Sequence, residues 1–167
     1  MNERKRIVVV LGMHRSGTSV VTRALQVMGV DLGSNLMPAM QKVNDKGFWE
    51  DVDVVSLNEE ILEALSITWH HLFPVTLDEV KKINRLGFLS RAVKLLRKKM
   101  RNCQVFGLKD PRMVKLLPFW KQVFARLDVE VNYIITLRHP LSVSRSLFKR
   151  DGFPLEKGHL MWLDHIV

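Results

Sequence analysis

The sequence predicts an α/β fold in which helices flank a parallel sheet on both sides, giving three layers. Three short apolar runs, rich in β-branched residues, predict the strands. Amphipathic segments with helical spacing alternate with these runs, an order typical of parallel sheets. The chain has 167 residues, the length of one domain, so we expect residues 1–167 to form a single domain.

The first unit is a strand, a short loop and a helix. Ile7 to Leu11 reads Ile-Val-Val-Val-Leu without polar alternation, so we expect a central strand that is buried on both faces. Gly12 to Gly17 forms the loop. Thr18 to Met28 predicts a helix because its apolar residues share one side, and Gly29 provides its C-terminal stop.

The middle of the chain predicts an irregular segment followed by helices. Val30 to Asp53 is rich in Gly, Asn, Asp and Pro, which favours loop structure. Val54 to Ser66 has the pattern of a helix. Asp78 to Arg101 predicts a longer helix that breaks near Gly87.

The second half repeats the alternation of strands and helices. Val105 to Leu108 predicts a strand, which Lys109-Asp110-Pro111 ends. Val131 to Leu137 predicts the third strand, and Pro140 suits the first turn of the helix after it. A helix between these strands is marked by apolar residues at 3-4-3 spacing, namely Leu117, Trp120, Phe124 and Leu127.

Composition limits the cellular compartment and the kinds of binding partner that we expect. The single cysteine, Cys103, cannot form an internal disulfide, and the apolar run after the charged N-terminus is too short for a secretory signal or a membrane span. We therefore expect a cytoplasmic protein without a membrane span. The net charge of +9 favours anionic partners. The basic run from Arg91 to Arg101 has the pattern of a solvated helix face, and a nucleic-acid surface is the alternative.

The loop after the first strand has the spacing of a phosphate-binding loop. Gly12 and Gly17 bound Met-His-Arg-Ser, and the predicted helix follows at once, so backbone N–H groups and a helix N-terminus converge on one point. The spacing is that of G-x-x-x-x-G-K-[ST], which predicts a P-loop-like nucleotide-binding architecture. Thr18 stands where that motif has its lysine, and Arg15 can supply the charge from within the loop.

Two motifs together resemble the sulfotransferases that use 3′-phosphoadenosine 5′-phosphosulfate (PAPS). The first is Arg15-Ser16-Gly17-Thr18-Ser19, which is similar to the family's first strand–helix loop. The second is Arg138 at a strand end with Ser146 eight positions later in the next helix, where the family binds the donor's 3′-phosphate. An arginine fork and a hydroxyl donor suit phosphate oxygens. The resemblance covers Arg6 to about Arg150.

The resemblance implies an activity and a set of donor-binding residues. It implies transfer of a sulfonyl group from PAPS to a hydroxyl or amine by in-line displacement, with no metal required. The acceptor would be a small molecule, a saccharide or a lipid. Arg15 would act on the 5′-phosphosulfate, and the donor would contact His14, Arg15, Ser16, Gly17, Thr18, Ser19, Arg138 and Ser146.

The resemblance also suggests a base, and the end of the second strand suggests two further cations for the site. Some members of the family use a glutamate after the first helix, so Glu50 is the candidate base, and its flanking Phe48-Trp49 could raise its pKa. The alternative for Glu50 is a solvated loop carboxylate. Lys109 would lie near the transferring group, with Arg112 near donor or acceptor, because ligands bind at the carboxyl ends of parallel strands.

Several alternatives stay open at the level of sequence. A P-loop kinase or nucleotidase with a degenerate loop would use Asp110 to hold magnesium, and the net charge alone favours a nucleic-acid-binding module. His70-His71 has no third metal ligand at a useful spacing, and Thr68 to Pro74 could line an acceptor pocket.

The last segment predicts an apolar helix without a stop signal. Leu155 to Val167 is largely apolar, and no Gly, Asn or basic residue ends it. This is typical of a chain that lacks its C-terminal part, or of a helix that docks on a partner. A homo-oligomer formed through an exposed C-terminal helix is therefore one expectation.

Overall fold

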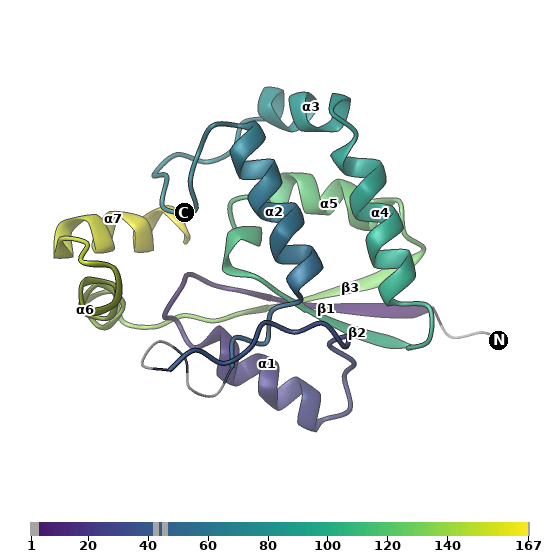
Figure 1. The fold of residues 1–167 in the computed structure, drawn as a ribbon, viewed down its shortest axis with the longest axis horizontal. Coiled ribbons are helices and arrows are strands. Elements are labelled where there is room, and N and C mark those ends of the chain that lie inside the picture. Colours follow the sequence, from purple (N-terminus) through teal and green to yellow (C-terminus); the bar gives the residue numbers. More distant parts are fainter. Residues whose placement is uncertain (1–3, 42–43, 45–46, 167) are drawn as a thin grey trace.

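The computed structural model describes residues 4–41, 44 and 47–166. It is an α/β structure with a three-stranded parallel sheet flanked by helices, as the sequence predicts (Figure 1). In chain order the elements are β1 (Lys5–Leu11), α1 (Thr18–Val27), α2 (Val52–Ala64), α3 (Leu77–Arg85), α4 (Phe88–Lys99), β2 (Val105–Lys109), the 3-10 turn η1 (Pro111–Met113), α5 (Leu117–Ala125), β3 (Val129–Ile135), α6 (Pro140–Asp151) and α7 (Leu155–Asp164).

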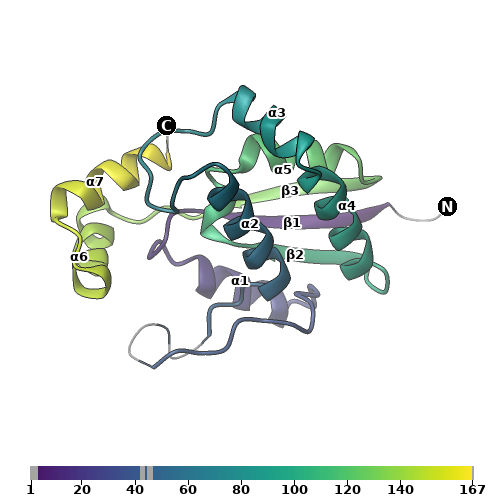
Figure 2. The ribbon, with the colours of Figure 1, turned by 45° about the horizontal axis from the view of Figure 1, so that its top comes forward.

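Strand β1 lies in the middle of the sheet, in the order β2-β1-β3, and both pairings are parallel. Its register pairs Ile7 with Phe106 on one side and with Val131 on the other. The prediction of a central strand buried on both faces is confirmed. Because all three strands run the same way, their carboxyl ends meet at one edge of the sheet (Figure 2).

Alternate side chains of β1 build two cores on opposite faces of the sheet. Ile7, Val9 and Leu11 belong to the large core beneath α2, α3, α4 and α5. Val8 and Val10 pack against α1 on the other face. The strand is apolar without alternation because each face needs its own apolar row. The result is a helix–sheet–helix arrangement (Figure 1).

The helix boundaries follow from their caps. Helix α2 begins two residues before the predicted Val54, because the Asp51 side chain accepts hydrogen bonds from the N–H groups of Asp53 and Val54. Helix α3 begins after a capping box formed by Thr76 and Glu79. The predicted break near Gly87 is confirmed, since Gly87 has a φ of 87° between α3 and α4.

Two expected boundaries differ from the structure. The third strand begins at Val129 and ends at Ile135, two residues earlier than predicted, because Glu130 and Asn132 lie on an exposed sheet edge where polar side chains remain in water. The segment Val30 to Asp53 has no helix in its described part up to Asp51, and its last two residues already belong to α2. It nevertheless reaches the sheet, where the N–H of Gly107 donates to the carbonyl of Asp31 over 2.7 Å.

Helices α6 and α7 lie beyond the carboxyl ends of the strands, away from the N-terminus (Figure 1). Gly158 of α7 sits so close to α6 that a Cβ there would be 2.8 Å from the Cα of Ser144. Met161 is fully buried between them, so the C-terminal helix is only partly exposed. Leu160, Leu163 and Ile166 do remain exposed, and association through them stays a prediction.

We expect Asn58 to be the polar residue on which the core most depends. Its side chain accepts from Trp120 Nε1 over 2.9 Å and donates to Asp110 Oδ2 over 2.8 Å, and all three residues are fully buried. Asn58→Ala leaves Trp120 Nε1 and Asp110 Oδ2 without the bond that each makes to Asn58, and it should lower the free energy of unfolding by roughly 3 kcal/mol. Urea denaturation measures this. The exposed Asn132→Ala is the control and should change stability by less than ~0.5 kcal/mol. Equal effects of the two variants would contradict this view of the core.

Candidate anion-binding active site

The loop between β1 and α1 is shaped by glycines at both ends. Gly12 has a φ of 151° and lies against β3, so that a Cβ would be 2.1 Å from Thr136 Oγ1. Gly17 caps α1 with a φ of 92°. No side chain caps this helix and its first turn has no acidic residue, so its N-terminal N–H groups and positive dipole end are available to an anion.

Arg15 connects the loop to the segment after β3. Its Nε donates to Ser146 Oγ over 2.8 Å, and its carbonyl accepts from Arg138 Nη1 over 3.0 Å. The two sequence motifs, more than 120 positions apart, thus meet at one residue. Burial lowers the pKa of the Arg15 guanidinium, and the neighbouring Arg150 and Arg138 lower it further. This concentration of positive charge favours an anion.

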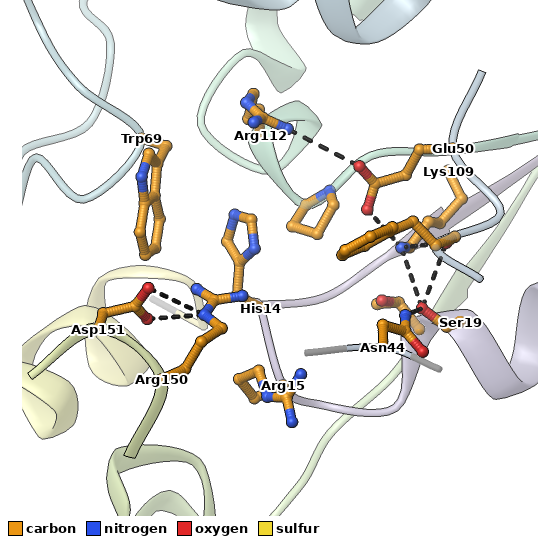
Figure 3. A pocket seen from close by; sticks show the side chains of 13 residues that line it. His14, Arg15, Ser19, Asn44, Glu50, Trp69, Lys109, Arg112, Arg150 and Asp151 are labelled. Atoms are coloured by element: carbon orange, nitrogen blue, oxygen red, sulfur yellow. Dashed lines mark hydrogen bonds and ion pairs between the residues drawn. The ribbon is translucent and has the colours of Figure 1, made fainter. Parts of the chain in front are cut away.

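A buried ion pair forms the centre of the site. Lys109 Nζ donates to Glu50 Oε1 over 2.6 Å, to the Phe48 carbonyl over 2.9 Å and to Ser19 Oγ over 3.3 Å (Figure 3). Lys109 is 3% exposed and Glu50 5%, so Glu50 is not the solvated loop carboxylate that was one alternative. Burial raises the pKa of Glu50, and Lys109 opposes that rise.

Asp110 and Arg112 follow Lys109 and have different surroundings. Asp110 is fully buried, caps the turn η1, and accepts from Arg112 Nη1 over 3.0 Å as well as from Asn58. Asp110 and Pro111 thus form the start of the 3-10 turn directly after the strand. Arg112 lines the pocket, donates to Glu59 over 2.8 Å and lies 3.9 Å from Glu50 Oε2.

The opposite wall combines a histidine, an aromatic ring and a second ion pair. The rings of His14 and Trp69 are 4.4 Å apart, centre to centre. Beside them, Arg150 donates to Asp151 over 2.8 Å (Figure 3). The Nε2 atom of His14 is buried without a hydrogen-bond partner among the described residues. Burial lowers its pKa well below the usual value, and Arg112, Arg150, Lys109 and His165 lower it further.

These groups surround an open pocket of about 230 Å³ at the carboxyl edge of the sheet. Pockets for whole drug-sized ligands enclose about 300–1,000 Å³, so this one suits a charged group at the end of a larger molecule. Of the residues predicted from sequence, the pocket contains His14, Arg15, Thr18, Ser19, Glu50 and Lys109.

The other predicted residues lie around the pocket rather than in it. Ser16 lines a neighbouring apolar pocket with Thr136 and Trp162. Gly17 is the cap of α1, while Arg138 and Ser146 contact Arg15 from outside. Arg138 and Ser146 are therefore brought to the same loop, and their binding of a 3′-phosphate stays a prediction.

Arg150, Trp69 and Asn44 are among the lining residues that were not assigned a role from the sequence. Arg150 follows Ser146 by four positions in α6, a spacing that places both on one helix face and could have identified it. Trp69 lies within the Thr68 to Pro74 segment, for which an acceptor pocket was one interpretation. Asn44, which donates to Ser19 Oγ over 3.2 Å, comes from an irregular segment that gives no sequence signal.

Comparisons with known proteins do not assign the chain to a family, so its function is inferred from the side-chain geometry. No family model matches the chain, and no curated protein or solved structure matches it significantly. Among the described residues, no three His, Cys, Asp or Glu side chains group as a metal site, and His70 contacts Trp69 and Phe153 instead. In the same part of the chain, no helix is long and apolar enough to cross a membrane.

The buried pair predicts a pH-dependent loss of stability in Lys109→Met. Removing the ammonium leaves the Glu50 carboxylate buried without compensation, and the free energy of unfolding at pH 7 should fall by roughly 3 kcal/mol. The variant also loses the effect that opposes the raised pKa of Glu50. An acid whose pKa is raised by folding destabilises the folded state above that pKa. The loss should therefore be smaller at pH 5 than at pH 7, because protonation of Glu50 becomes easier as the pH falls.

Urea denaturation at the two pH values measures this effect. Glu50→Gln in the Lys109→Met background should restore part of the stability at pH 7. Lys81→Met removes an exposed ion pair with Asp78 and is the matched control, expected to cost less than ~1 kcal/mol at either pH. A pH-independent loss in Lys109→Met would contradict the coupling between the two buried groups.

Proposed function

We propose that this chain is a PAPS-dependent sulfotransferase domain with a P-loop-like donor site. The donor binds with its 5′-phosphosulfate in the pocket, and its sulfonyl group passes to a hydroxyl or amine acceptor. The observation that carries the proposal is the buried Lys109 ammonium beside the hydroxyl of Ser19.

The position of Lys109 matters because of the motif around Ser19. In the spacing G-x-x-x-x-G-K-[ST], Ser19 occupies the place of the hydroxyl that holds Mg²⁺ in nucleoside triphosphatases. Here a protein cation lies 3.3 Å from that hydroxyl, fixed by Glu50 and the Phe48 carbonyl. A fixed ammonium at this point supports charge stabilisation by the protein itself and a reaction that requires no metal.

The loop and its flanking arginines suit the two charged ends of the donor. The free N-terminus of α1 and Arg15 favour the 5′-phosphosulfate, since both present donors to anionic oxygens. Arg138 and Ser146 reach the same loop from the segment after β3. Their common contact with Arg15 supports one ligand that extends across both motifs.

The proposed reaction is a displacement at sulfur. The acceptor atom attacks the sulfur in line with the bond to the bridging phosphate oxygen. That bond breaks, and its electron pair leaves with 3′-phosphoadenosine 5′-phosphate. Lys109 and Arg15 would stabilise the negative charge that develops on the bridging and sulfonyl oxygens. Glu50 is the base expected from the resemblance, and it also holds Lys109 in place.

The alternative of a P-loop kinase is less well supported by the surroundings of Asp110. Its Oδ1 accepts from Arg112 and its Oδ2 from Asn58, and neither oxygen lines the pocket. A nucleic-acid-binding module is supported only by net charge. Several cations of the site line one pocket, which favours a small anionic group as ligand.

Ligand-induced stabilisation tests the proposal. In a thermal shift titration without metal, 3′-phosphoadenosine 5′-phosphate at about a hundred times its Kd should stabilise the fold by ~2.7 kcal/mol. For a chain of this size, that is a Tm increase of roughly 5–11 °C. The controls are 5′-AMP and Mg²⁺-ATP. A shift with Mg²⁺-ATP alone would favour the kinase, and equal affinities for 5′-AMP and the bisphosphate would contradict the sulfotransferase.

Arg138→Ala tests the recognition of the 3′-phosphate. Loss of a charge-assisted bond costs about 1.5–3 kcal/mol, so the Kd for the bisphosphate should rise roughly 10- to 150-fold. The Kd for 5′-AMP, which lacks the 3′-phosphate, should change much less. Arg145→Ala is the matched control, because Arg145 is an exposed arginine of the same segment, on α6. Isothermal titration calorimetry measures all six constants, for the wild type and the two variants with each ligand, and parallel losses for both ligands in Arg138→Ala would argue against a 3′-phosphate contact.

A further inference from the structure

The position of His14 in the pocket is not explained by the proposed contacts with the donor. Its Nε2 is buried and has no hydrogen-bond partner among the residues that the structure describes. A buried polar atom without a partner costs free energy, so its persistence points to a partner that arrives with a ligand. His14 lines the pocket together with Ser19 and Lys109, and its ring projects between Trp69 and Arg112 (Figure 3).

The ring of His14 is held in position by aromatic packing. The Trp69 indole lies 4.4 Å from it, centre to centre, with the planes inclined by 54°. Trp69 is itself fixed by Phe153 at 5.8 Å and by the Arg150 guanidinium at 5.5 Å from its ring. Because packing holds the ring while Nε2 has no hydrogen-bond partner among the described residues, that nitrogen stays available to a reacting group.

We propose that His14 is a catalytic residue that accepts the proton of the acceptor group during sulfonyl transfer. The inference rests on the proposed function. As the acceptor oxygen forms its bond to sulfur, its proton moves to the Nε2 lone pair. The bond between sulfur and the bridging phosphate oxygen breaks, and its electron pair leaves with the bisphosphate. The imidazolium then returns its proton to water, so that charge and atoms balance.

Glu50, the base expected from the resemblance, has a different arrangement. Its Oε1 accepts from Lys109 over 2.6 Å, and its Oε2 lies 3.9 Å from Arg112 Nη1. Protonating Glu50 would remove the compensation of Lys109 in a buried setting, which is costly. Glu50 is therefore a positioning residue that holds Lys109 beside Ser19. His14 does not compensate the charge of Lys109, so its protonation does not disturb that ion pair.

The charges around His14 explain how it becomes a better base when the donor binds. In the free protein burial favours the neutral imidazole, and the cations that face His14 from four segments favour it further. A bound phosphosulfate or bisphosphate compensates these cations, so the pKa of His14 should rise toward neutrality, where a general base is most effective. The groups that face it are Arg15 of the loop, Glu50 and Lys109, Arg112 of η1, Arg150 and Asp151 of α6, and His165 after α7.

An NMR titration tests this without catalysis. The imidazole signal of His14, identified by its loss in His14→Gln, is followed against pH with and without saturating 3′-phosphoadenosine 5′-phosphate. We expect it to titrate far below pH 6.5 in the free chain and at least one pH unit higher in the complex. An unchanged midpoint in a saturated complex would overturn the proposal, even if the bisphosphate binds as the proposed function requires.

Donor hydrolysis, in which water is the acceptor, tests the catalytic step. His14→Ala should reduce sulfate release from PAPS by about 10²–10⁴-fold. Its Kd for the bisphosphate should stay within threefold of the wild-type value. Added imidazole should restore part of the rate in His14→Ala, which a purely structural role would not allow. His159→Gln, which alters a histidine of α7 bonded to the Leu155 carbonyl, is the control with full activity expected.

The outcomes separate the two proposals. Failure of the wild-type chain to bind the bisphosphate would overturn the proposed function and this assignment with it. Binding and hydrolysis that are unaffected in His14→Ala would overturn only the assignment. The pH–rate profile gives a third readout. The wild-type rate should rise with pH to a plateau, with the midpoint found by NMR in the complex, and His14→Gln should lose that limb.

Discussion

The parallel register of β1 between β2 and β3 is the constraint from which the site arises. Three chain segments leave the same edge of the sheet, and each carries a cation shortly after its strand. Arg15, Lys109 and Arg138 are far apart in sequence, yet each is placed by the end of a strand. An antiparallel β2 or β3 would send one of them to the opposite edge of the sheet.

Gathering these cations at one edge of the sheet creates a positive field. Glu50 balances Lys109, and Asp151 balances Arg150. Burial and the neighbouring Arg150 and Arg138 lower the pKa of Arg15, and Asp151 opposes that change. Burial also lowers the pKa of His14, and the same positive field lowers it further. A bound anion offsets the electrostatic part of both changes, so ligand affinity and the protonation of His14 are coupled through the same charges.

Features that are contiguous in sequence were predicted, and features that need tertiary contact were not. The strand, loop and helix from Ile7 to Met28 follow from apolar runs and glycine positions, and the structure places them as expected. The motif spacing also indicated Arg138, which does reach the loop. The pairing of Glu50 with Lys109 spans 59 positions and depends on how an irregular segment folds over the sheet edge. No local pattern encodes that path, which is why Glu50 could equally have been a solvated carboxylate.

Glu50 and His14 have different roles in the proposal because protonating the two side chains costs different amounts of free energy. A carboxylate that compensates a buried ammonium cannot give up its charge without exposing that ammonium to an apolar environment. A neutral imidazole compensates no buried cation, so protonating it leaves no ammonium without a counter-charge. Its conjugate acid forms next to the departing anion. Because Lys109 is fixed by Glu50 and belongs to the protein, its charge is present in every ligand state. A metal ion would instead arrive and leave with the nucleotide. In such a site the pH dependence of the reaction is governed by the group that is free to change its charge, and in this pocket that group is His14.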